Sequence, residues 1–375
     1  MQVDKDSHSR IRVYALYFRD PSDEASLADS ASRDHHPSMS SLASVLIVGC
    51  GSIGERHLRC FQQTGRVGVT ACDTSVALGE RMTATYGVPA LSDAAAAITS
   101  GNFNIVVICT PAPLHIPLAV AALNAGSHVL IEKPLSHSLA GLADLFTARQ
   151  RSGRQVAVAY VYHVFPFLTA AGEFIRRGEF GPTLHATATS GQAFNLLRPA
   201  YAQTYYRDRA TGGGGIQDAL THVANWMESV LGPTASLLCD CAHLALPGVD
   251  VEDTVHLSAR HGRVLVNYTL NQFQHPNETT LQFNAAGGSV KIEFHQQRWG
   301  TFAAGTSAWT WHDTPVPGRD THFINQAHAF LDQVDGQPAR LCSLEAAAQT
   351  LLFNLAALAA AESGSRVHLH QLTAS

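Results

Sequence analysis

Residues 45–54 read VLIVGCGSIG, a short apolar run that ends in the pattern G-x-G-x-x-G and leads at once into a helical segment, residues 55–63. This order of strand, glycine turn and helix suits the pyrophosphate of a dinucleotide. Gly49 allows a sharp turn, Gly51 lets the phosphates approach the main chain, and Gly54 lets the helix pack closely on the strand. The pattern predicts a dinucleotide-binding Rossmann domain.

Two further features of this region concern the cofactor. Ser52 and Ile53 open the helix, and we expect their free backbone N–H groups to bind phosphate. Asp73 follows a second apolar run, residues 67–72. A carboxylate there accepts hydrogen bonds from ribose hydroxyls and repels a 2′-phosphate, so NAD is favoured while NADP remains an alternative. The competing interpretation is a glycine-rich turn in an ordinary α/β unit.

Composition narrows the class of protein. The chain has 375 residues, 46% of them apolar, and a net charge of −5, which suits two domains and gives no sign of nucleic-acid or membrane binding. The seven cysteines are scattered, as is typical of reduced thiols in a cytoplasmic protein. Cys239 and Cys241 lie on one face of a predicted strand, but no second pair completes a metal site. We therefore expect no metal.

The first domain continues as alternating strands and helices. One strand, residues 105–109, leads into Thr110, Pro111 and His115, and another, residues 128–131, ends in Glu132, Lys133 and Pro134. Such apolar strands form a parallel sheet that binds ligands beyond its carboxyl edge. We therefore expect these residues, apart from Pro134, to contact the cofactor. A lysine that extends along the sheet edge into solvent is the alternative for Lys133.

The second half of the chain has a different pattern. A helix over residues 165–177 is followed by short runs that alternate as strands do. The predicted strands are residues 184–189, 236–244, 254–258, 264–270, 279–284 and 289–294. They predict a largely antiparallel open sheet, whose exposed face would join a homodimer or homotetramer. A last helix, residues 343–362, is rich in Ala and Leu, so we expect it to be buried against the first domain.

A glycine run precedes a candidate catalytic pair. Residues 211–222 read TGGGGIQDALTH, in which four glycines would let a flexible backbone approach a ligand. Asp218 and His222 are four residues apart, so a helix would present them on one face. A histidine oriented by a carboxylate suits acid–base chemistry near neutral pH. A structural pair and a metal-binding pair that lacks a third ligand remain alternatives.

With these residues in place, the chain resembles the glucose-fructose oxidoreductase, inositol dehydrogenase and rhizopine catabolism (Gfo/Idh/MocA) family. The matching elements are the glycine turn, Thr110-Pro111 with His115, and residues 126–135, and the resemblance extends over residues 43–368. It implies that Lys133 lies beside the nicotinamide ring and that Pro134 follows a cis or otherwise restricted bond. It also implies that Asp218 and His222 complete a catalytic set with Lys133, and that the protein is a homo-oligomer.

The chain departs from the family pattern where substrate contacts are expected. Tyr162 and His163 stand where many relatives carry Asn and Arg. The loop over residues 201–209 offers aromatic rings and guanidinium groups, of which Tyr206 and Arg207 are our candidates for stacking on a sugar and for binding a carboxylate. A solvated loop explains the same residues equally well. The substrate is therefore less defined than the cofactor.

The expected fold is α/β, with an N-terminal Rossmann parallel sheet and a C-terminal α+β domain. We expect a disordered extension over 1–42, a dinucleotide-binding domain over 43–160, a substrate and oligomerisation domain over 161–342, and a C-terminal helix over 343–375 that packs toward the first domain. The expected activity is NAD(P)-dependent oxidation of a secondary alcohol of a sugar, cyclitol or similar polyol. A metabolite-sensing regulator and an NAD-dependent glycosidase on the same fold are the alternatives.

Overall fold

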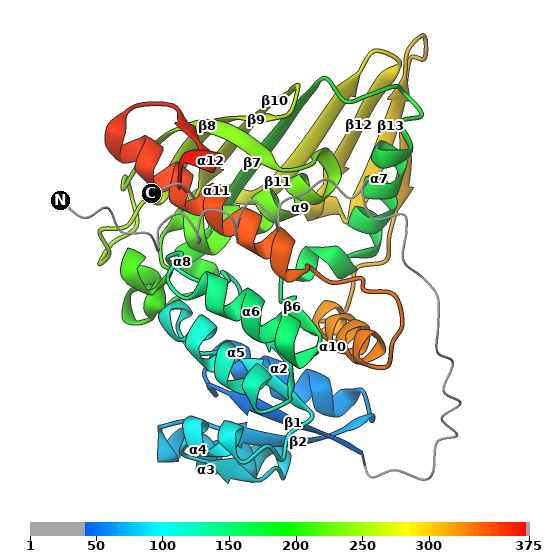
Figure 1. Cartoon of the computed structure of the whole chain (residues 1–375). Coiled ribbons are helices and arrows are strands. Elements are labelled where there is room, and N and C mark those ends of the chain that lie inside the picture. Colours follow the sequence, from blue (N-terminus) through cyan, green and yellow to red (C-terminus); the bar gives the residue numbers. More distant parts are fainter. Residues whose placement is uncertain (1–41, 373–375) are drawn as a thin grey trace, which may run out of the picture.

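The computed structural model describes residues 42–372 (Figure 1). The predicted extension therefore lies outside the described residues except for its last position. Within this range the chain forms two sheets, one parallel and one mostly antiparallel, with helices packed on and between them. The predicted fold class is confirmed.

Within residues 42–372, six strands form the parallel sheet in the order β3-β2-β1-β4-β5-β6, with the sequence running outward in both directions from β1. The strands are β1 (Ala43–Val48), β2 (Val67–Cys72), β3 (Ala90–Leu91), β4 (Ile105–Ile108), β5 (His128–Ile131) and β6 (Val156–Val158). The direction of the order reverses between β1 and β4, and a ligand in such a fold binds beyond the carboxyl ends of the strands at this point.

Both faces of the parallel sheet are buried, which explains why its strands are apolar throughout. On β1, Val45 and Ile47 pack on one side, whereas Leu46 and Val48 pack on the other. Helices α2 and α3 cover the first side, and α5 and α6 cover the second. The helices of this domain are α2 (Ser52–Gln63), α3 (Val76–Tyr86), α4 (Ala94–Thr99), α5 (His115–Asn124) and α6 (Leu142–Ser152).

The second sheet, of nine strands within the described range, runs in the order β14-β13-β12-β11-β7-β10-β9-β8-β15. Its strands are β7 (His185–Ala193), β8 (Thr234–Ala242), β9 (Thr254–His261), β10 (Val264–Asn271), β11 (Phe273–Ala285), β12 (Gly288–Glu293), β13 (Arg298–Ala303), β14 (Thr310–Asp313) and β15 (Val367–His368). β7 and β10 are parallel, and the other described neighbours are antiparallel. The largely antiparallel sheet is thus confirmed, with β13, β14 and β15 as strands that the sequence analysis did not predict.

Helices cover one face of this second sheet. They are α7 (Pro166–Arg177), α9 (Thr221–Leu231) and α11 (Leu344–Ser363), with the short α8 (Phe194–Leu197) and α12 (Leu369–Leu372) beside them. The beginning of α11, at Leu344 and Ala348, packs in the core of the first domain, whereas Phe353 and Ala357 pack in the core of the second. By length and composition α11 would suffice to cross a membrane, but 61% of its apolar window is buried within the protein. It is therefore best described as a shared core helix.

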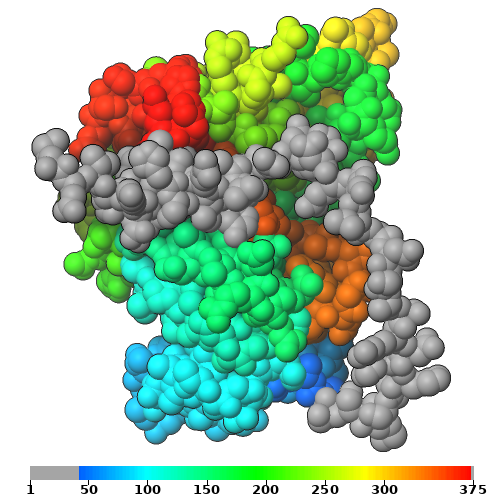
Figure 2. Space-filling model, in the orientation of Figure 1, coloured from blue at the N-terminus to red at the C-terminus, as the bar shows by residue number. Residues whose placement is uncertain are grey.

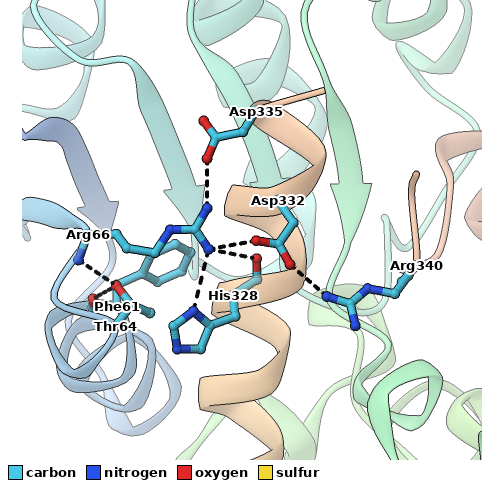
Figure 3. Close-up of polar contacts among 7 residues, drawn as sticks. All are labelled: Phe61, Thr64, Arg66, His328, Asp332, Asp335 and Arg340. Atoms are coloured by element: carbon cyan, nitrogen blue, oxygen red, sulfur yellow. Dashed lines mark hydrogen bonds and ion pairs between the residues drawn. The ribbon is translucent and has the colours of Figure 1, made fainter. Parts of the chain in front are cut away.

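Helix α10 (Thr321–Val334) follows the second sheet but packs on α2, where Phe330 and Leu331 join the core of the first domain. In the space-filling view its orange surface lies between the two halves of the molecule (Figure 2). Arg66 fixes this contact by donating to Asp332 and Asp335, both at 2.7 Å, and Arg340 donates to the other oxygen of Asp332 at 2.7 Å (Figure 3). The ion pairs are partly exposed, so the apolar contact carries most of the stability.

Candidate active site

The glycine turn after β1 has the geometry that a dinucleotide needs. Gly49 has φ +90°, and a Cβ at Gly54 would lie 1.7 Å from the carbonyl oxygen of Gly49. Helix α2 thus approaches β1 more closely than any side chain would allow. A Cβ at Gly51, in contrast, would meet no atom within 4 Å, so the main chain there borders open space at the start of α2. This arrangement fits a bound pyrophosphate.

Two polar groups next to this turn support the same interpretation. Asp73, at the end of β2, accepts the N–H of Cys50 at 2.7 Å and the N–H of Ser75 at 2.8 Å, so its carboxylate is held rigidly beside the glycine turn. Thr110, at the end of β4, has a buried hydroxyl with no hydrogen-bond partner among the described residues. An orphaned hydroxyl at this edge of the sheet indicates a missing ligand. The residues present therefore fit NAD.

Lys133 leaves the carboxyl end of β5 and reaches the second domain. Its Nζ donates to the backbone carbonyl of Asp218 at 2.9 Å and to Oδ1 of the same residue at 2.7 Å. The Lys133–Pro134 peptide bond is cis, as the family resemblance implied. The side chains of this ion pair are 12% and 6% exposed, so a lysine that merely extends into solvent does not describe the structure.

Asp218 lies in a short π-helical turn, Ile216–Leu220, that continues into α9. Such turns occur often at functional sites because they re-aim side chains within a helix. The preceding glycines are needed for close packing and not for flexibility. A Cβ at Gly213 would lie 2.2 Å from the carbonyl oxygen of Tyr206, and one at Gly214 would lie 2.5 Å from Oε1 of Glu252. The glycine run therefore fixes the position of Asp218.

A tyrosine completes the ion pair of Lys133. Tyr205 donates its hydroxyl hydrogen to Oδ1 of Asp218 at 2.6 Å. Burial raises the pKa of Asp218, but the charges of Lys133 and Arg198 and the two hydrogen bonds outweigh it and lower that pKa to about 2. Asp218 is thus a carboxylate at neutral pH. The sequence analysis named the adjacent Tyr206 instead of Tyr205, because nothing in the spacing of the loop separates the two.

His222 lies one helical turn after Asp218, between aromatic rings. Its ring centroid is 5.9 Å from that of Tyr160 and 5.1 Å from that of Tyr162. Burial, followed by the charge of Lys133, lowers the pKa of His222 to about 3, so the imidazole is neutral at physiological pH. Its Nδ1 is buried without a hydrogen-bond partner in the described part of the chain. The neutral imidazole therefore carries a ring nitrogen that no described residue engages.

Glu132 and His115, which the sequence predicts as cofactor contacts, lie under the surface of the site. Glu132 is buried and bonds His57 of α2 at 2.7 Å, while its other oxygen accepts the N–H of Lys133 at 3.0 Å. His115 is buried between the carbonyl oxygens of Thr110 at 2.7 Å and Pro134 at 2.9 Å. Both side chains therefore hold the segments that carry Thr110 and Lys133. Pro111 is exposed at the same edge.

The four residues predicted to contact substrate are not gathered in one place. Tyr162 packs beside His222, as described above. His163 bonds Asn225 at 2.8 Å, and Tyr206 is buried with its hydroxyl on Gln272 at 2.5 Å. Arg207 is exposed. Tyr162 is thus the one among these four whose ring borders the Lys133–Asp218–His222 group.

No group of three or more His, Cys, Asp or Glu side chains that could hold a metal ion occurs among residues 42–372. Cys239 and Cys241 lie next to one another on β8 as free thiols. The polar side chains that the structure brings together beyond the carboxyl end of β5 are Lys133, Asp218 and Tyr205, with His222 one helical turn away.

Comparison with known families agrees with this geometry. Residues 43–160 match the model described as "Oxidoreductase family, NAD-binding Rossmann fold", and residues 168–316 match the GFO/IDH/MocA C-terminal domain. The chain belongs to the Gfo/Idh/MocA oxidoreductase family. Its first domain is the NAD-binding domain of that family, and its second sheet is the family's C-terminal domain.

Individual relatives are distant. An uncharacterized oxidoreductase, YdgJ of Escherichia coli K12, is 29% identical over 45% of this chain and 48% of its own length. A levoglucosan dehydrogenase of Pseudarthrobacter phenanthrenivorans is 27% identical over 55% of this chain and 59% of its own. The chain thus spans about half the length of the curated relatives that it matches. A solved levoglucosan dehydrogenase in complex with NADH superposes with a TM-score of 0.79 at 20% identity, over 88% of this chain and 99% of that one.

Lowering the pH is expected to destabilise the wild type more than a His222→Asn variant. The pKa of His222 in the folded protein is about 3, whereas an unfolded histidine titrates at about 6.5. Below about pH 6.5 only the unfolded chain takes up this proton, so the free energy of unfolding falls as the pH drops toward 3. Unfolding midpoints at about pH 7.5 and 5.5 test this. The exposed His256→Asn is the control, and equal losses in all three proteins would contradict the prediction.

Proposed function

We propose that this protein is an NAD-dependent dehydrogenase that oxidises a secondary alcohol of a sugar, cyclitol or similar small polyol. One observation carries the proposal: Lys133 of the NAD-binding domain bonds Asp218 of the second domain at 2.7 Å, at the carboxyl edge of the parallel sheet. His222 and Tyr205 border the same pair. A cation, a neutral imidazole and a carboxylate thus meet where the nicotinamide end of a bound dinucleotide is expected.

NAD, when bound, supplies the acceptor for the hydride that leaves the carbinol carbon. Gly51, Ser52 and Ile53 would hold its pyrophosphate, and Asp73 its adenosine ribose, which favours NAD over NADP. The rest of the reaction falls to the protein, which must orient the alcohol and manage its proton.

The proton of the substrate hydroxyl passes to His222 in this proposal. The imidazole is neutral at pH 7 because its pKa is about 3. Burial and then the positive charge of Lys133 lower this pKa. The same charge stabilises negative charge on the substrate oxygen, so the hydroxyl becomes more acidic. Asp218 keeps Lys133 oriented through its hydrogen bond of 2.7 Å. The ring of Tyr162 lies 5.1 Å from that of His222 between centroids, so it borders the place proposed for the substrate.

The substrate class draws further support from the names of relatives. Proteins called inositol 2-dehydrogenase and levoglucosan dehydrogenase are among those similar to this chain. Both names denote oxidation of a cyclic polyol or anhydrosugar, and a site of alternating polar and aromatic groups is suited to such compounds.

Incubation of the purified protein with NAD or NADP and a panel of sugars and cyclitols tests the proposal. We expect the absorbance of reduced nicotinamide to appear with at least one polyol and more rapidly with NAD. His222→Ala is expected to lower kcat by about 100-fold or more while NADH binding, followed by fluorescence, stays unchanged. His256→Ala, an exposed histidine on β9, serves as the matched control and should retain full activity.

Two other results would overturn the proposal in different ways. Tight NADH binding without turnover of any polyol would indicate a metabolite-sensing regulator. Release of an aglycone without net formation of NADH would indicate a glycosidase that uses NAD transiently.

We also propose a cytoplasmic homodimer or homotetramer joined through the second sheet. Leu238 of β8 and Leu265 of β10 are 40% and 49% exposed, and they alternate with core residues, so they lie on the face away from α9 and α11. Apolar residues on an open sheet face favour burial against a second copy. Light scattering on the purified protein would give the oligomeric state, and a monomer at micromolar concentration would contradict this proposal.

A further inference from the structure

Two buried side chains, His57 of α2 and Glu132 directly after β5, form a pair next to Lys133. They are 1% and 6% exposed, and Nε2 of His57 donates to Oε1 of Glu132 at 2.7 Å. Among the described residues, neither side chain forms a hydrogen bond with Asp218 or Tyr205. The pair therefore lies outside the group that would meet the substrate, and it can affect that group only through its neighbours.

Glu132 uses its second oxygen to hold the backbone that carries the lysine. Its Oε2 accepts the N–H of Lys133 at 3.0 Å, and its own N–H donates to the carbonyl of Ile108 on β4 at 2.9 Å. Burial raises the pKa of Glu132, but the hydrogen bond from His57, followed by the charge of Lys133, outweighs burial and lowers that pKa. The side chain is thus a carboxylate at neutral pH and accepts both hydrogen bonds.

Lys133 is consequently held at both ends. Glu132 fixes its backbone N–H, and Oδ1 of Asp218 accepts from its Nζ at 2.7 Å. Because a flexible four-carbon stem joins these two ends, a shift of the peptide group changes the direction from which Nζ reaches any third group. A misplacement of about 1 Å at a reacting group lowers a rate by about 100-fold. The position of this peptide group therefore matters for the proposed reaction.

His57 is itself held between two helices. It lies three residues after Gly54, where α2 approaches β1 closely. Its ring is nearly perpendicular to that of Phe323 on α10, with 5.6 Å between the centroids. A histidine packed in this way resists movement when the turn after β5 shifts. Through Glu132 it ties the position of Lys133 to α2, whose N-terminus is the proposed site of the cofactor pyrophosphate.

We propose that His57 is a positioning residue of the enzyme: by holding the carboxylate of Glu132, it sets the place of the Lys133 amine relative to the bound cofactor. This inference rests on the proposed function and adds a residue to it. Two hydrogen bonds, of 2.7 and 3.0 Å, make the connection from α2 to the backbone of Lys133. The competing role for His57 is to fill space between α2 and α10, which an apolar side chain of similar size would do equally well.

Two substitutions at His57 differ in whether the hydrogen bond to Glu132 survives. His57→Gln keeps an N–H donor, whereas His57→Leu fills the space without one. We expect His57→Leu to lower kcat by about 30-fold and to change KM and the Kd for NADH less than about threefold. His57→Gln should recover most of kcat. Gln62→Met, which removes a hydrogen bond to the carbonyl of Tyr86 from the same helix, is the matched control and should keep full activity.

Lys133 can also be observed directly, because the chain contains three lysines, at positions 5, 133 and 291. Isotope labelling of lysine at Cε gives one NMR signal for each, and Lys133→Arg identifies the signal of Lys133. We expect this signal to shift in His57→Leu and to keep its place in His57→Gln. The signal of Lys291, whose Nζ lies 4.8 Å from the ring centroid of Trp309, is the internal reference and should not move. No substrate is needed for this measurement.

The outcomes separate this inference from the proposed function. Absence of turnover with every polyol would count against the dehydrogenase, and the lysine signal would then decide the inference alone. An unchanged Lys133 signal in His57→Leu, or equal losses of kcat in His57→Leu and Gln62→Met, would overturn it. If His57→Leu does not fold, His57→Asn, whose amide is too short to reach Glu132, replaces it in both measurements with the same expected results.

Discussion

Replacing Lys133 with methionine is expected to lower kcat by about three orders of magnitude. The substitution removes the charge that, in the proposed mechanism, stabilises the substrate oxygen, and it leaves Asp218 buried without its cation. Loss of one partner of a buried ion pair costs about 3 kcal/mol or more in free energy of unfolding. Steady-state kinetics and denaturant unfolding measure the two effects separately.

A second variant separates chemistry from stability. Lys133→Met combined with Asp218→Asn removes both charges while the amide oxygen still accepts the hydrogen bond of Tyr205. We expect this double variant to regain most of the lost stability and none of the activity. If activity returned along with stability, Lys133 would be a structural residue and the proposed chemistry would be wrong.

Alanine substitutions at two glycines of the nucleotide turn should have different effects, one on folding and the other on cofactor binding. In Gly54→Ala the new Cβ would lie 1.7 Å from the carbonyl oxygen of Gly49, so α2 must move away from β1. We expect a loss of at least about 3 kcal/mol in free energy of unfolding, at the upper end of overpacking effects. In Gly51→Ala the Cβ meets no atom within 4 Å, and φ is −66°, so folding should be unaffected.

The same methyl group at Gly51 would occupy the space where the pyrophosphate approaches the main chain. We expect the Kd for NADH of Gly51→Ala to rise by about tenfold or more, the equivalent of one lost charge-assisted hydrogen bond. Thermal unfolding and NADH fluorescence titration of the two variants form the test. Normal NADH binding by Gly51→Ala would place the cofactor elsewhere.

Much of the first domain could be predicted because its signals are local. Each of these apolar strands is followed by a residue of a type that is common in ligand sites at the carboxyl edge of a parallel sheet. Gly49, Asp73, Thr110 and Lys133 are therefore placed at that edge once the strands are assigned. Their hydrogen-bond partners, in contrast, are not determined by neighbouring sequence. That Lys133 bonds Asp218, 85 positions away, depends on how the domains pack.

Other parts of the structure were missed for identifiable reasons. Strand β13 contains Gly300, whose missing side chain makes room for the ring of Trp311 on β14. A glycine within a run weakens its resemblance to a strand. The loop before Asp218 folds as short 3₁₀ turns, in which adjacent residues diverge without a regular period. Tyr205 consequently donates a hydrogen bond to Asp218 while Tyr206 is buried on Gln272.

Helix α10 differs from these segments, because its sequence does carry a helical pattern. Phe323, Ala327, Phe330 and Val334 follow a spacing of four, three and four residues, as an amphipathic helix requires. The sequence does not indicate that this helix leaves the second sheet and packs on α2. Contacts between segments more than 250 positions apart, such as Arg66 with Asp332, are decided by the packing of both domains.

Helix α11 couples the stability of the two domains. One rigid rod of 20 residues has its first turns in one hydrophobic core and its later turns in the other. Neither core is complete without it, so neither half keeps its full free energy of folding when the other comes apart. A destabilising substitution in the nucleotide-binding domain should therefore lower the stability of the second sheet as well. The chain then folds and unfolds as one cooperative unit.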